Sequence, residues 1–339
     1  MEQIAFGETG RSTTRLGFGC SSLMGAMSRR ESLAVLDWAY DAGIRHFDVA
    51  PMYGYGEAES CLGEFLQGHR SQVTVTSKYG ILPPKNTSLL SAARRFAVPL
   101  VKKLPGFKER IARTAKAVTR TAEKASFTPG QAKASLERSL AALRTGHIDL
   151  WLLHDVSVAD LNDDSLLSFL DEEVQRGRIG SFGVGSGGAE ISDLLVERAA
   201  YCRVVQYEWS VLKGERKLEG ALTGTAFRIH HRSLANAFRM LGDALNNDKE
   251  RCRRWSDSTK TDLGDPRGLA RLMLKAAFVM NPGSVVLFSS KNPRHIQTNV
   301  DVADDPSLEA PAKELYRLAQ AEREQLFASG RGQARYPYL

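Results

Sequence analysis

The stretch that decides the fold is RHFDVAPMYGYGEAE, residues 45–59 of the chain. It begins as a short apolar run that carries one carboxylate, Asp48, and Pro51 disfavours helical backbone at the residue before it. Tyr53 follows five residues after Asp48, two glycines mark a turn, and a helical pattern begins at Glu57. The stretch therefore predicts a strand, a loop and a helix, with Asp48 at the strand end and Tyr53 in the loop. In a barrel of alternating strands and helices, catalytic groups lie at this end of the strands.

Outward from this stretch, short apolar runs alternate with amphipathic segments, which is typical of a parallel α/β fold. Residues 4–18 predict an N-terminal β-hairpin, and Ser28 and Thr128 carry the patterns of helix N-caps. The predicted barrel strands are 16–20, 44–50, 73–77, 148–153, 182–185, 204–209, 227–231 and 284–288. Two to three helices are expected after the last strand, ending near Phe327. The prediction is an α/β fold, one (β/α)8 TIM barrel over residues 1–339, with the hairpin and a long insertion after strand 3.

The insertion, residues 79–127, interrupts the alternation because an ordinary connection there takes only a few residues. It holds eleven Lys or Arg against two Glu, a balance of +9, whereas the full chain carries +7 and the remainder therefore −2. Because it follows the third strand, it is expected beside the catalytic face. Two interpretations stay open, a lid or substrate-selecting loop and a partly disordered basic loop. A polyanion site is a third hypothesis, disfavoured by the lack of interleaved aromatic residues or a nucleic-acid motif.

Cysteine usage and hydropathy indicate a cellular compartment. The four cysteines are scattered without a CxxC pair, which is typical of reduced thiols and not of a disulfide framework or zinc site. The first residues do not resemble a signal peptide, and no apolar run is long enough to span a bilayer. The expectation is a cytoplasmic protein without a metal site. The adjacent His230 and His231 are expected on opposite faces of one strand.

Three segments together resemble one protein family. HFDVAPMYGYGEAE at residues 46–59 resembles the aldo-keto reductase signature, VTVTSKYG at 73–80 places Lys78 at the next strand end, and IDLWLLHD at 148–155 places His154 at the following one. The resemblance implies a catalytic tetrad of Asp48, Tyr53, Lys78 and His154. Taken singly, each residue has an ordinary structural explanation, such as a loop aromatic or a turn cap. Some sugar-dehydrogenase branches of the family resemble this chain in carrying a long segment after the third strand.

The implied chemistry is hydride transfer to or from a small aldehyde, ketone or sugar. Tyr53 would act as the general acid or base, and the ammonium of Lys78 would lower the pKa of that phenol. Asp48 would hold the ammonium in place, and His154 would orient the carbonyl group. The leading hypothesis is an NAD(P)(H)-dependent oxidoreductase that interconverts a carbonyl and an alcohol. The alternative is a cofactor-binding regulatory or redox-sensing barrel with little turnover. Neither nucleic acid nor membrane is expected as a partner.

The cofactor residues follow partly from the resemblance and partly from charge. No GxGxxG fingerprint is present, so an extended dinucleotide across the barrel mouth is implied. The resemblance implies that Gln206 binds the nicotinamide carboxamide, with Ser186 as the second polar contact. It implies that Asn299 lies on the adenine side. His231 and Arg232 stand where the family usually has an aromatic residue and a serine, a departure that favours the regulatory alternative.

Two further groups complete the predicted cofactor site. Ser289, Ser290 and Lys291 suit a phosphate beside a helix start. Together with Arg294 and His295 they favour a ribose 2′-phosphate, so NADP(H) is preferred over NAD(H). The end of the first strand is also predicted to contact the cofactor, through Gly19, Cys20 and Ser21.

Overall fold

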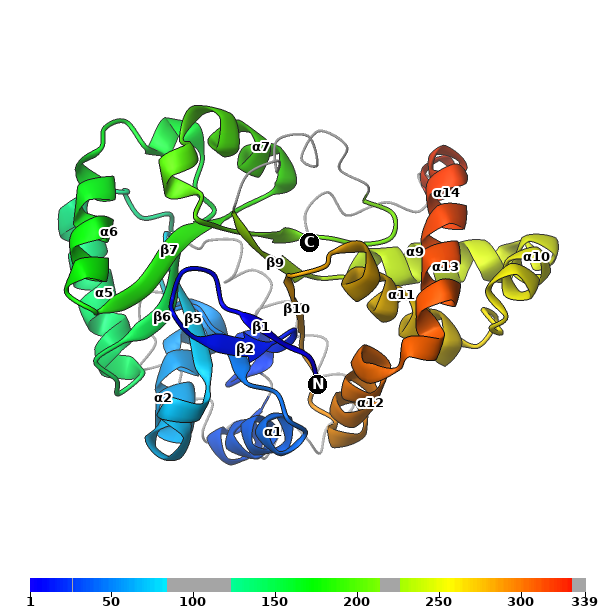
Figure 1. The fold of residues 1–339 in the computed structure, drawn as a ribbon, viewed down its shortest axis with the longest axis horizontal. Coiled ribbons are helices and arrows are strands. Elements are labelled where there is room, and N and C mark those ends of the chain that lie inside the picture. The colour runs from blue at the N-terminus through cyan, green and yellow to red at the C-terminus, as the bar shows by residue number, and fades with distance from the viewer. Residues whose placement is uncertain (26, 84–122, 214–225, 331–339) are drawn as a thin grey trace, which may run out of the picture.

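The protein is a closed barrel of eight parallel strands surrounded by helices (Figure 1). The computed structural model describes residues 1–25, 27–83, 123–213 and 226–330. Each barrel strand pairs with the next one along the chain, and the last closes on the first. The strands are β3 (Leu16–Gly19), β4 (His46–Asp48), β5 (Thr74–Tyr79), β6 (Ile148–His154), β7 (Ile179–Gly185), β8 (Val204–Glu208), β9 (Phe227–His231) and β10 (Val285–Phe288). The barrel prediction is confirmed.

The predicted N-terminal hairpin is present as a separate two-stranded antiparallel sheet, β1 (Gln3–Ala5) and β2 (Ser12–Thr14). Phe6, which directly follows β1, packs among apolar residues of the barrel interior. Its ring lies 4.8 Å from the ring of His46 and 5.5 Å from that of Phe227, at the starts of two strands. The hairpin therefore closes the N-terminal end of the barrel and leaves the opposite end for a site.

Helices cover the outside of the barrel, and their starts follow local chemistry. Ser28 and Glu31 form the predicted capping box, and the Thr128 hydroxyl accepts from the Gln131 amide. The helices are α1 (Arg29–Asp41), α2 (Ala58–His69), α5 (Pro129–Ala142), α6 (Ser165–Gln175), α7 (Gly188–Glu197), α9 (Ala235–Asn247), α10 (Lys249–Thr259), α11 (Pro266–Met280), α12 (Pro293–Asp304), α13 (Glu309–Ala321) and α14 (Arg323–Gly330). Of these, α9, α10 and α11, between β9 and β10, were not predicted.

The two ends of the predicted insertion are held together at the barrel rim. Ile81 and Lys124 form an antiparallel bridge, the Leu82 amide donates to the Glu123 carbonyl, and the Ala125 amide donates to the Gly80 carbonyl. Residues 84–122 lie outside the described residues, and the lid expectation falls on them. The described ends place the entry to and exit from this segment on the C-terminal side of β5.

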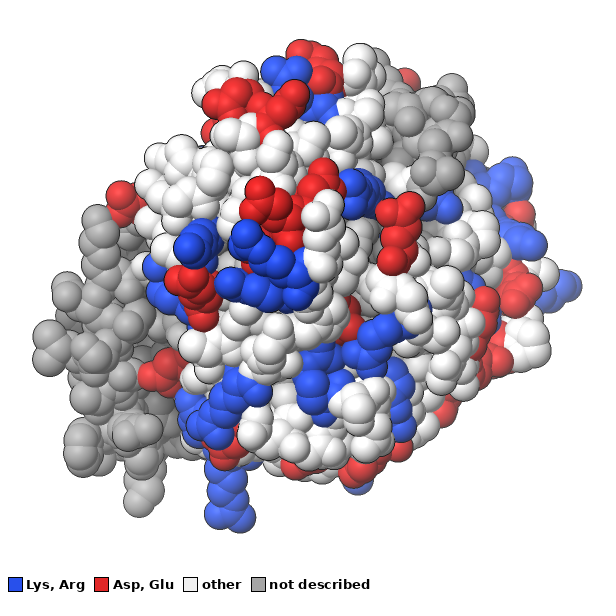
Figure 2. All heavy atoms as spheres, turned by 60° about the vertical axis from the view of Figure 1, so that its left-hand side comes forward, with Lys and Arg blue, Asp and Glu red and all other residues white. Residues whose placement is uncertain are grey.

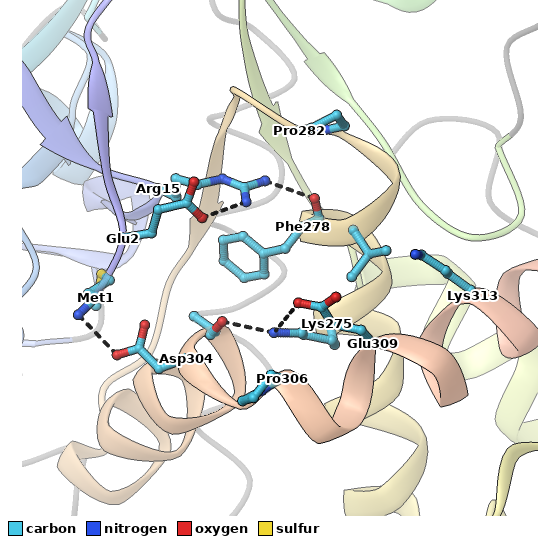
Figure 3. Close-up of a pocket in the computed structure, with 12 residues that line it drawn as sticks. Met1, Glu2, Arg15, Lys275, Phe278, Pro282, Asp304, Pro306, Glu309 and Lys313 are labelled. Carbon is cyan, nitrogen blue, oxygen red and sulfur yellow. Dashed lines mark hydrogen bonds and ion pairs between the residues drawn. The ribbon is translucent and has the colours of Figure 1, made fainter.

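Arg15 and Lys275 hold the additional helix α11 to the barrel and to α12, respectively (Figure 3). Arg15, just before β3, donates to the carbonyl oxygens of Phe278 at 2.8 Å and Asn281 at 3.0 Å. Lys275, whose side chain is 5% exposed, donates to the Ala303 carbonyl at 3.0 Å. These carbonyls lie at the C-terminal ends of α11 and α12, where the helix dipole favours positive charge. Two of the cations that line the pocket between these elements, Arg15 and Lys275, therefore already have partners.

One buried carboxylate joins the hairpin to the barrel. Asp149, in β6, has no exposed side-chain surface. Its Oδ1 accepts from Arg11 at 2.8 Å, and its Oδ2 accepts from Arg70 at 3.0 Å and from the Val75 amide at 2.8 Å. Because a buried charge is tolerated only when its oxygens are satisfied, these three donors belong to one structural unit.

We expect Asp149→Ala to lower the free energy of unfolding by about 3–5 kcal/mol, because it leaves two partly buried guanidinium groups without their partner. Urea denaturation measures the change. The matched control is Asp257→Ala, which removes an exposed pair with Arg253 whose side chains are 71% and 70% exposed. The control is expected to change stability by less than about 1 kcal/mol. Equal losses in the two variants would contradict a structural role for Asp149.

Candidate active site

A cavity of about 690 Å³ opens at the C-terminal end of the barrel strands. Asp48 and Lys78 reach it from the ends of β4 and β5, and His154 from the end of β6. Tyr53 reaches it from the 3-10 turn Tyr53–Gly56, in which Gly54 and Tyr55 have left-handed backbone. The structure thus brings the four side chains of the predicted tetrad together in one cavity.

The centre of the cavity is a buried ion pair between Lys78 and Asp48. The Lys78 ammonium is 2% exposed and donates to Asp48 Oδ1 and, at 3.3 Å, to the Val49 carbonyl. Its Nζ lies 5.4 Å from the centre of the Tyr53 ring. Burial by itself would lower the pKa of Lys78, but Asp48 and Tyr53 outweigh it and raise that pKa. The ammonium is therefore charged at neutral pH, as the proposed chemistry needs.

The pKa of the Tyr53 phenol differs from the expected one. Burial raises the pKa of Tyr53, Lys78 opposes this, and Asp48 adds to the increase, so the net shift is upward. A lower pKa was expected from the ammonium of Lys78 alone. A phenolate loses more by desolvation than it gains from a lysine that is already paired with a carboxylate. In this environment Tyr53 keeps its proton, which suits a group that donates to an alkoxide.

The imidazole of His154 is neutral in this site. Burial, then Lys78 and His231, lower the pKa of His154 to about 3. A neutral imidazole offers one N–H donor and one acceptor nitrogen. His154 can therefore donate a hydrogen bond to a carbonyl oxygen, but it cannot supply a proton as a cation.

The predicted cofactor residues divide into two groups. Those that line the same cavity are Gly19, Ser21, Ser186, Gln206, His231, Arg232, Ser289 and Asn299. Within this group the Ser186 hydroxyl donates to the Val156 carbonyl at 2.7 Å, and Gln206 donates to Asp48 at 2.7 Å. Both side chains are therefore already oriented by protein partners.

The remaining predicted residues lie away from the cavity wall. Cys20 is fully buried, and burial raises the pKa of its thiol well above the usual value. Lys291, Arg294 and His295 are exposed around the start of α12. There the Arg294 amide, one of the donors expected for a phosphate, is bound by the side chain of its cap, Asn292, at 3.0 Å. Ser290, next to Lys291, is half-buried.

Four polar residues that line the cavity were not predicted, namely Asp155, Glu208, Lys213 and Ser233. Glu208 lies 3.2 Å from Lys213 and 3.9 Å from Arg232. Because Glu208 is two residues after Gln206 on one strand, the alternation of side chains could have placed it on the same face. Ser233 is 3% exposed, and its hydroxyl has no hydrogen-bond partner among the described residues. It directly follows Arg232, where the predicted motif departs from the family pattern.

The described residues also bear on the expectations about metals, membranes and polyanions. Within them, no group of three or more His, Cys, Asp or Glu is arranged to hold a metal ion. None of the helices in the described part of the chain is long and apolar enough to cross a membrane. Figure 2 shows one face on which Lys and Arg lie among Asp and Glu. On that face the charges of the two signs are mixed.

Comparison with known proteins gives one family. Residues 15–223 match the model of the Aldo/keto reductase family. A D-threo-aldose 1-dehydrogenase of Pseudomonas sp is 33% identical over half of this chain and 49% of its own length. A pyridoxal 4-dehydrogenase of Microbacterium luteolum is 39% identical over 25% of this chain and 30% of its own length. The chain thus aligns with half or less of each of these relatives.

Solved structures share the fold at low sequence identity. An aldo-keto reductase from Bacillus halodurans in its holo form superimposes with a TM-score of 0.66, at 18% identity, over 94% of this chain and 96% of its own. An aldo/keto reductase from Klebsiella pneumoniae, in complex with NADP and acetate, gives a TM-score of 0.64 at 18% identity over 95% of each chain. These likenesses establish the barrel fold.

The lowered pKa values of four histidines indicate how stability depends on pH. Burial lowers the pKa of His46, His154, His230 and His231 to about 3 in each case. The unfolded chain takes up protons on these groups below about pH 6.5 while the folded chain does not, so stability falls as the pH decreases. Each histidine contributes a loss of about 2 kcal/mol between pH 7 and pH 5.

We expect His230→Phe, which removes one such group away from the cavity, to make the unfolding free energy less dependent on pH. Urea denaturation at pH 7 and pH 5 measures this, and the difference between the variant and the unaltered protein cancels the other titrating groups. The variant should lose about 2 kcal/mol less than the unaltered protein over this range. Identical pH dependence in the two proteins would show that folding does not lower the pKa of His230.

Proposed function

Because this chain belongs to the aldo/keto reductase family, we propose that it is a nicotinamide-dependent oxidoreductase that interconverts a carbonyl group and an alcohol. The substrate class is a small aldehyde, ketone or sugar. The observation that carries the proposal is the buried pair of Lys78 and Asp48 beside Tyr53 and His154 in one cavity. We also propose that residues 1–339 act as one catalytic unit in the cytoplasm.

The roles of the four residues follow from their charges. Tyr53, whose pKa is raised by burial, donates its proton to the oxygen of the reduced carbonyl. Lys78 stabilises the phenolate that remains, and Asp48 keeps the ammonium charged and in place. Neutral His154 donates a hydrogen bond to the carbonyl oxygen and orients it. In the oxidative direction the same groups take the proton from an alcohol.

A nicotinamide cofactor, when bound, supplies or accepts the hydride. The cavity fits such a group because it contains the buried Ser233 hydroxyl, which has no partner in the described part of the chain, and a buried hydroxyl of this kind needs one. Gln206, Ser186 and Arg232 are the residues proposed to hold the nicotinamide half. His231 is proposed to lie against the ring.

We propose NADP(H) as the preferred cofactor, with NAD(H) as the alternative. Lys291, Arg294 and His295 form an exposed basic group around the first turn of α12, which suits a ribose 2′-phosphate. A structural relative from Klebsiella pneumoniae is described in complex with NADPH. Asn299, which lines the cavity and belongs to the same helix, is proposed to contact the adenosine half.

The regulatory alternative receives less support than the enzyme. It was based on the departure at His231 and Arg232, but Arg232 lies in the cavity and faces Glu208, so the altered strand end still presents a polar group to the site. The buried tetrad charges are expensive to maintain and are explained by catalysis. Relatives named as an aldose dehydrogenase and, in Arabidopsis thaliana, an L-galactose dehydrogenase make an aldose the first substrate to test.

We expect Tyr53→Phe to reduce turnover about 10²–10⁴-fold because the substitution removes the proton donor. Steady-state oxidation of aldoses and reduction of aromatic aldehydes, followed by nicotinamide absorbance, measure the change. Affinity for NADPH should stay within a few-fold of that of the unaltered protein. Full activity in Tyr53→Phe would contradict the assigned chemistry, and loss of cofactor binding would mean that the Tyr53 hydroxyl is a binding contact.

We expect Lys291→Ala to weaken NADPH binding about 10-fold or more, since a charge-assisted contact to a phosphate contributes roughly 1.5–3 kcal/mol. Fluorescence titration with NADPH and NADH measures both affinities, and NADH binding should not change. Lys133→Ala is the matched control because Lys133 is an exposed lysine on α5. Equal losses for NADPH and NADH, or for the two variants, would contradict a 2′-phosphate site at Lys291.

A further inference from the structure

A hydrogen bond crosses the mouth of the barrel from Gln206 to Asp48. Gln206 lies on β8 and Asp48 on β4, and three strands separate β8 from β4 in either direction around the closed barrel. The bond joins Gln206 Nε2 to Asp48 Oδ2 at 2.7 Å, and each residue is only 3% exposed. It therefore links opposite walls of the barrel inside the proposed catalytic centre.

The charge of Asp48 determines which residue donates this hydrogen bond and which accepts it. A carboxylate paired with an ammonium can only accept, so the Gln206 atom that meets it is the amide nitrogen. The two oxygens of Asp48 then have different partners, with Oδ1 accepting from Lys78 and Oδ2 accepting from Gln206. Since one N–H of its amide is committed to Asp48, Gln206 offers its oxygen and its second N–H to a ligand in the cavity.

We propose that Gln206 is a positioning residue for proton transfer, in addition to the cofactor contact that its place in the cavity suggests. By holding Oδ2, it fixes the rotation of the Asp48 carboxylate that presents Oδ1 to Lys78. The ammonium is thereby kept facing the Tyr53 ring, 5.4 Å from its centre. This inference rests on the proposed function, because it requires Tyr53 to be the group that carries the proton.

The physical reason is the cost of an unsatisfied buried oxygen. Without the amide, Oδ2 of Asp48, a residue that is only 3% exposed, would lose its charge-assisted donor. The Asp48 carboxylate would then hold the Lys78 ammonium with both oxygens. It would compete more strongly with a Tyr53 phenolate for that ammonium. Since Lys78 is the group that favours the phenolate, Tyr53 would titrate at higher pH. A residue that contacts only the cofactor would not change the titration of Tyr53.

The first test compares Gln206→Met with Gln206→Glu at saturating cofactor. Methionine has a similar size but no donor, so kcat is expected to fall about 10–100-fold and the pKa that governs kcat to rise. Glutamic acid can donate to Asp48 only when protonated, so its kcat should recover towards low pH. If Gln206→Met changes only the Kd and KM of the cofactor, with kcat and its pH profile unchanged, Gln206 is a binding residue alone and the proposal is wrong.

The second test needs no turnover. The phenolate absorbance of Tyr53 is obtained as the difference between a protein and its Tyr53→Phe variant across a pH titration. The Tyr53 pKa is expected to be higher in Gln206→Met than in the unaltered protein. Ser186→Ala is the matched control, because Ser186 lines the same cavity on the neighbouring loop but donates to the Val156 carbonyl. It is expected to leave the Tyr53 titration unchanged.

The two tests separate the two proposals. Absence of turnover with every substrate would overturn the proposed function, yet the absorbance titration would still report on Gln206. An unchanged Tyr53 pKa in Gln206→Met, in a variant shown to be folded by circular dichroism, would overturn the positioning role whether or not the protein turns over substrate. A raised pKa in that variant together with an unchanged pKa in Ser186→Ala supports it.

Discussion

The buried ion pair between Lys78 and Asp48 is the interaction on which the candidate site depends. Two opposite charges are stable out of water only when their remaining hydrogen-bonding groups also find partners. Here Lys78 donates to the Val49 carbonyl and Asp48 accepts from Gln206. The pair therefore requires three strands, β4, β5 and β8, to be held at fixed positions. Only a closed barrel keeps opposite walls in such register.

The two ends of the barrel differ in function, because one is closed by apolar residues and the other opens into a polar cavity. Phe6 and the apolar interior residues fill the N-terminal end of the barrel. At the same end Asp149 accepts hydrogen bonds from Arg11 and Arg70. The C-terminal ends of the strands instead present Asp48, Lys78 and His154 to a cavity. This arrangement agrees with the general behaviour of such barrels, in which one face supports stability and the other carries chemistry.

Much of the fold and part of the site could be predicted from particular residues. The apolar runs around Phe47, Val75 and Leu150 predicted three barrel strands, and the capping residues Ser28 and Thr128 predicted two helix starts. Helix α9 was not predicted, although its buried residues Ala237, Leu241 and Leu245 recur every four positions. That region lies outside the segments that resemble the family, and its helical periodicity was not taken to predict a helix. Glu208 was not predicted, although it follows Gln206 by two residues on β8 and strand alternation places both on the face that lines the cavity.

The sequence by itself determined the order of the barrel strands and the helix start signals at Ser28 and Thr128, because these depend on neighbours along the chain. Only the tertiary structure decided the upward pKa shift of Tyr53 and the bond from Gln206 to Asp48. Burial depends on atoms brought in from every strand, and a hydrogen bond between residues 158 positions apart follows from barrel closure. Desolvation and long-range contact have no local signal, and for that reason they appear only in the folded molecule.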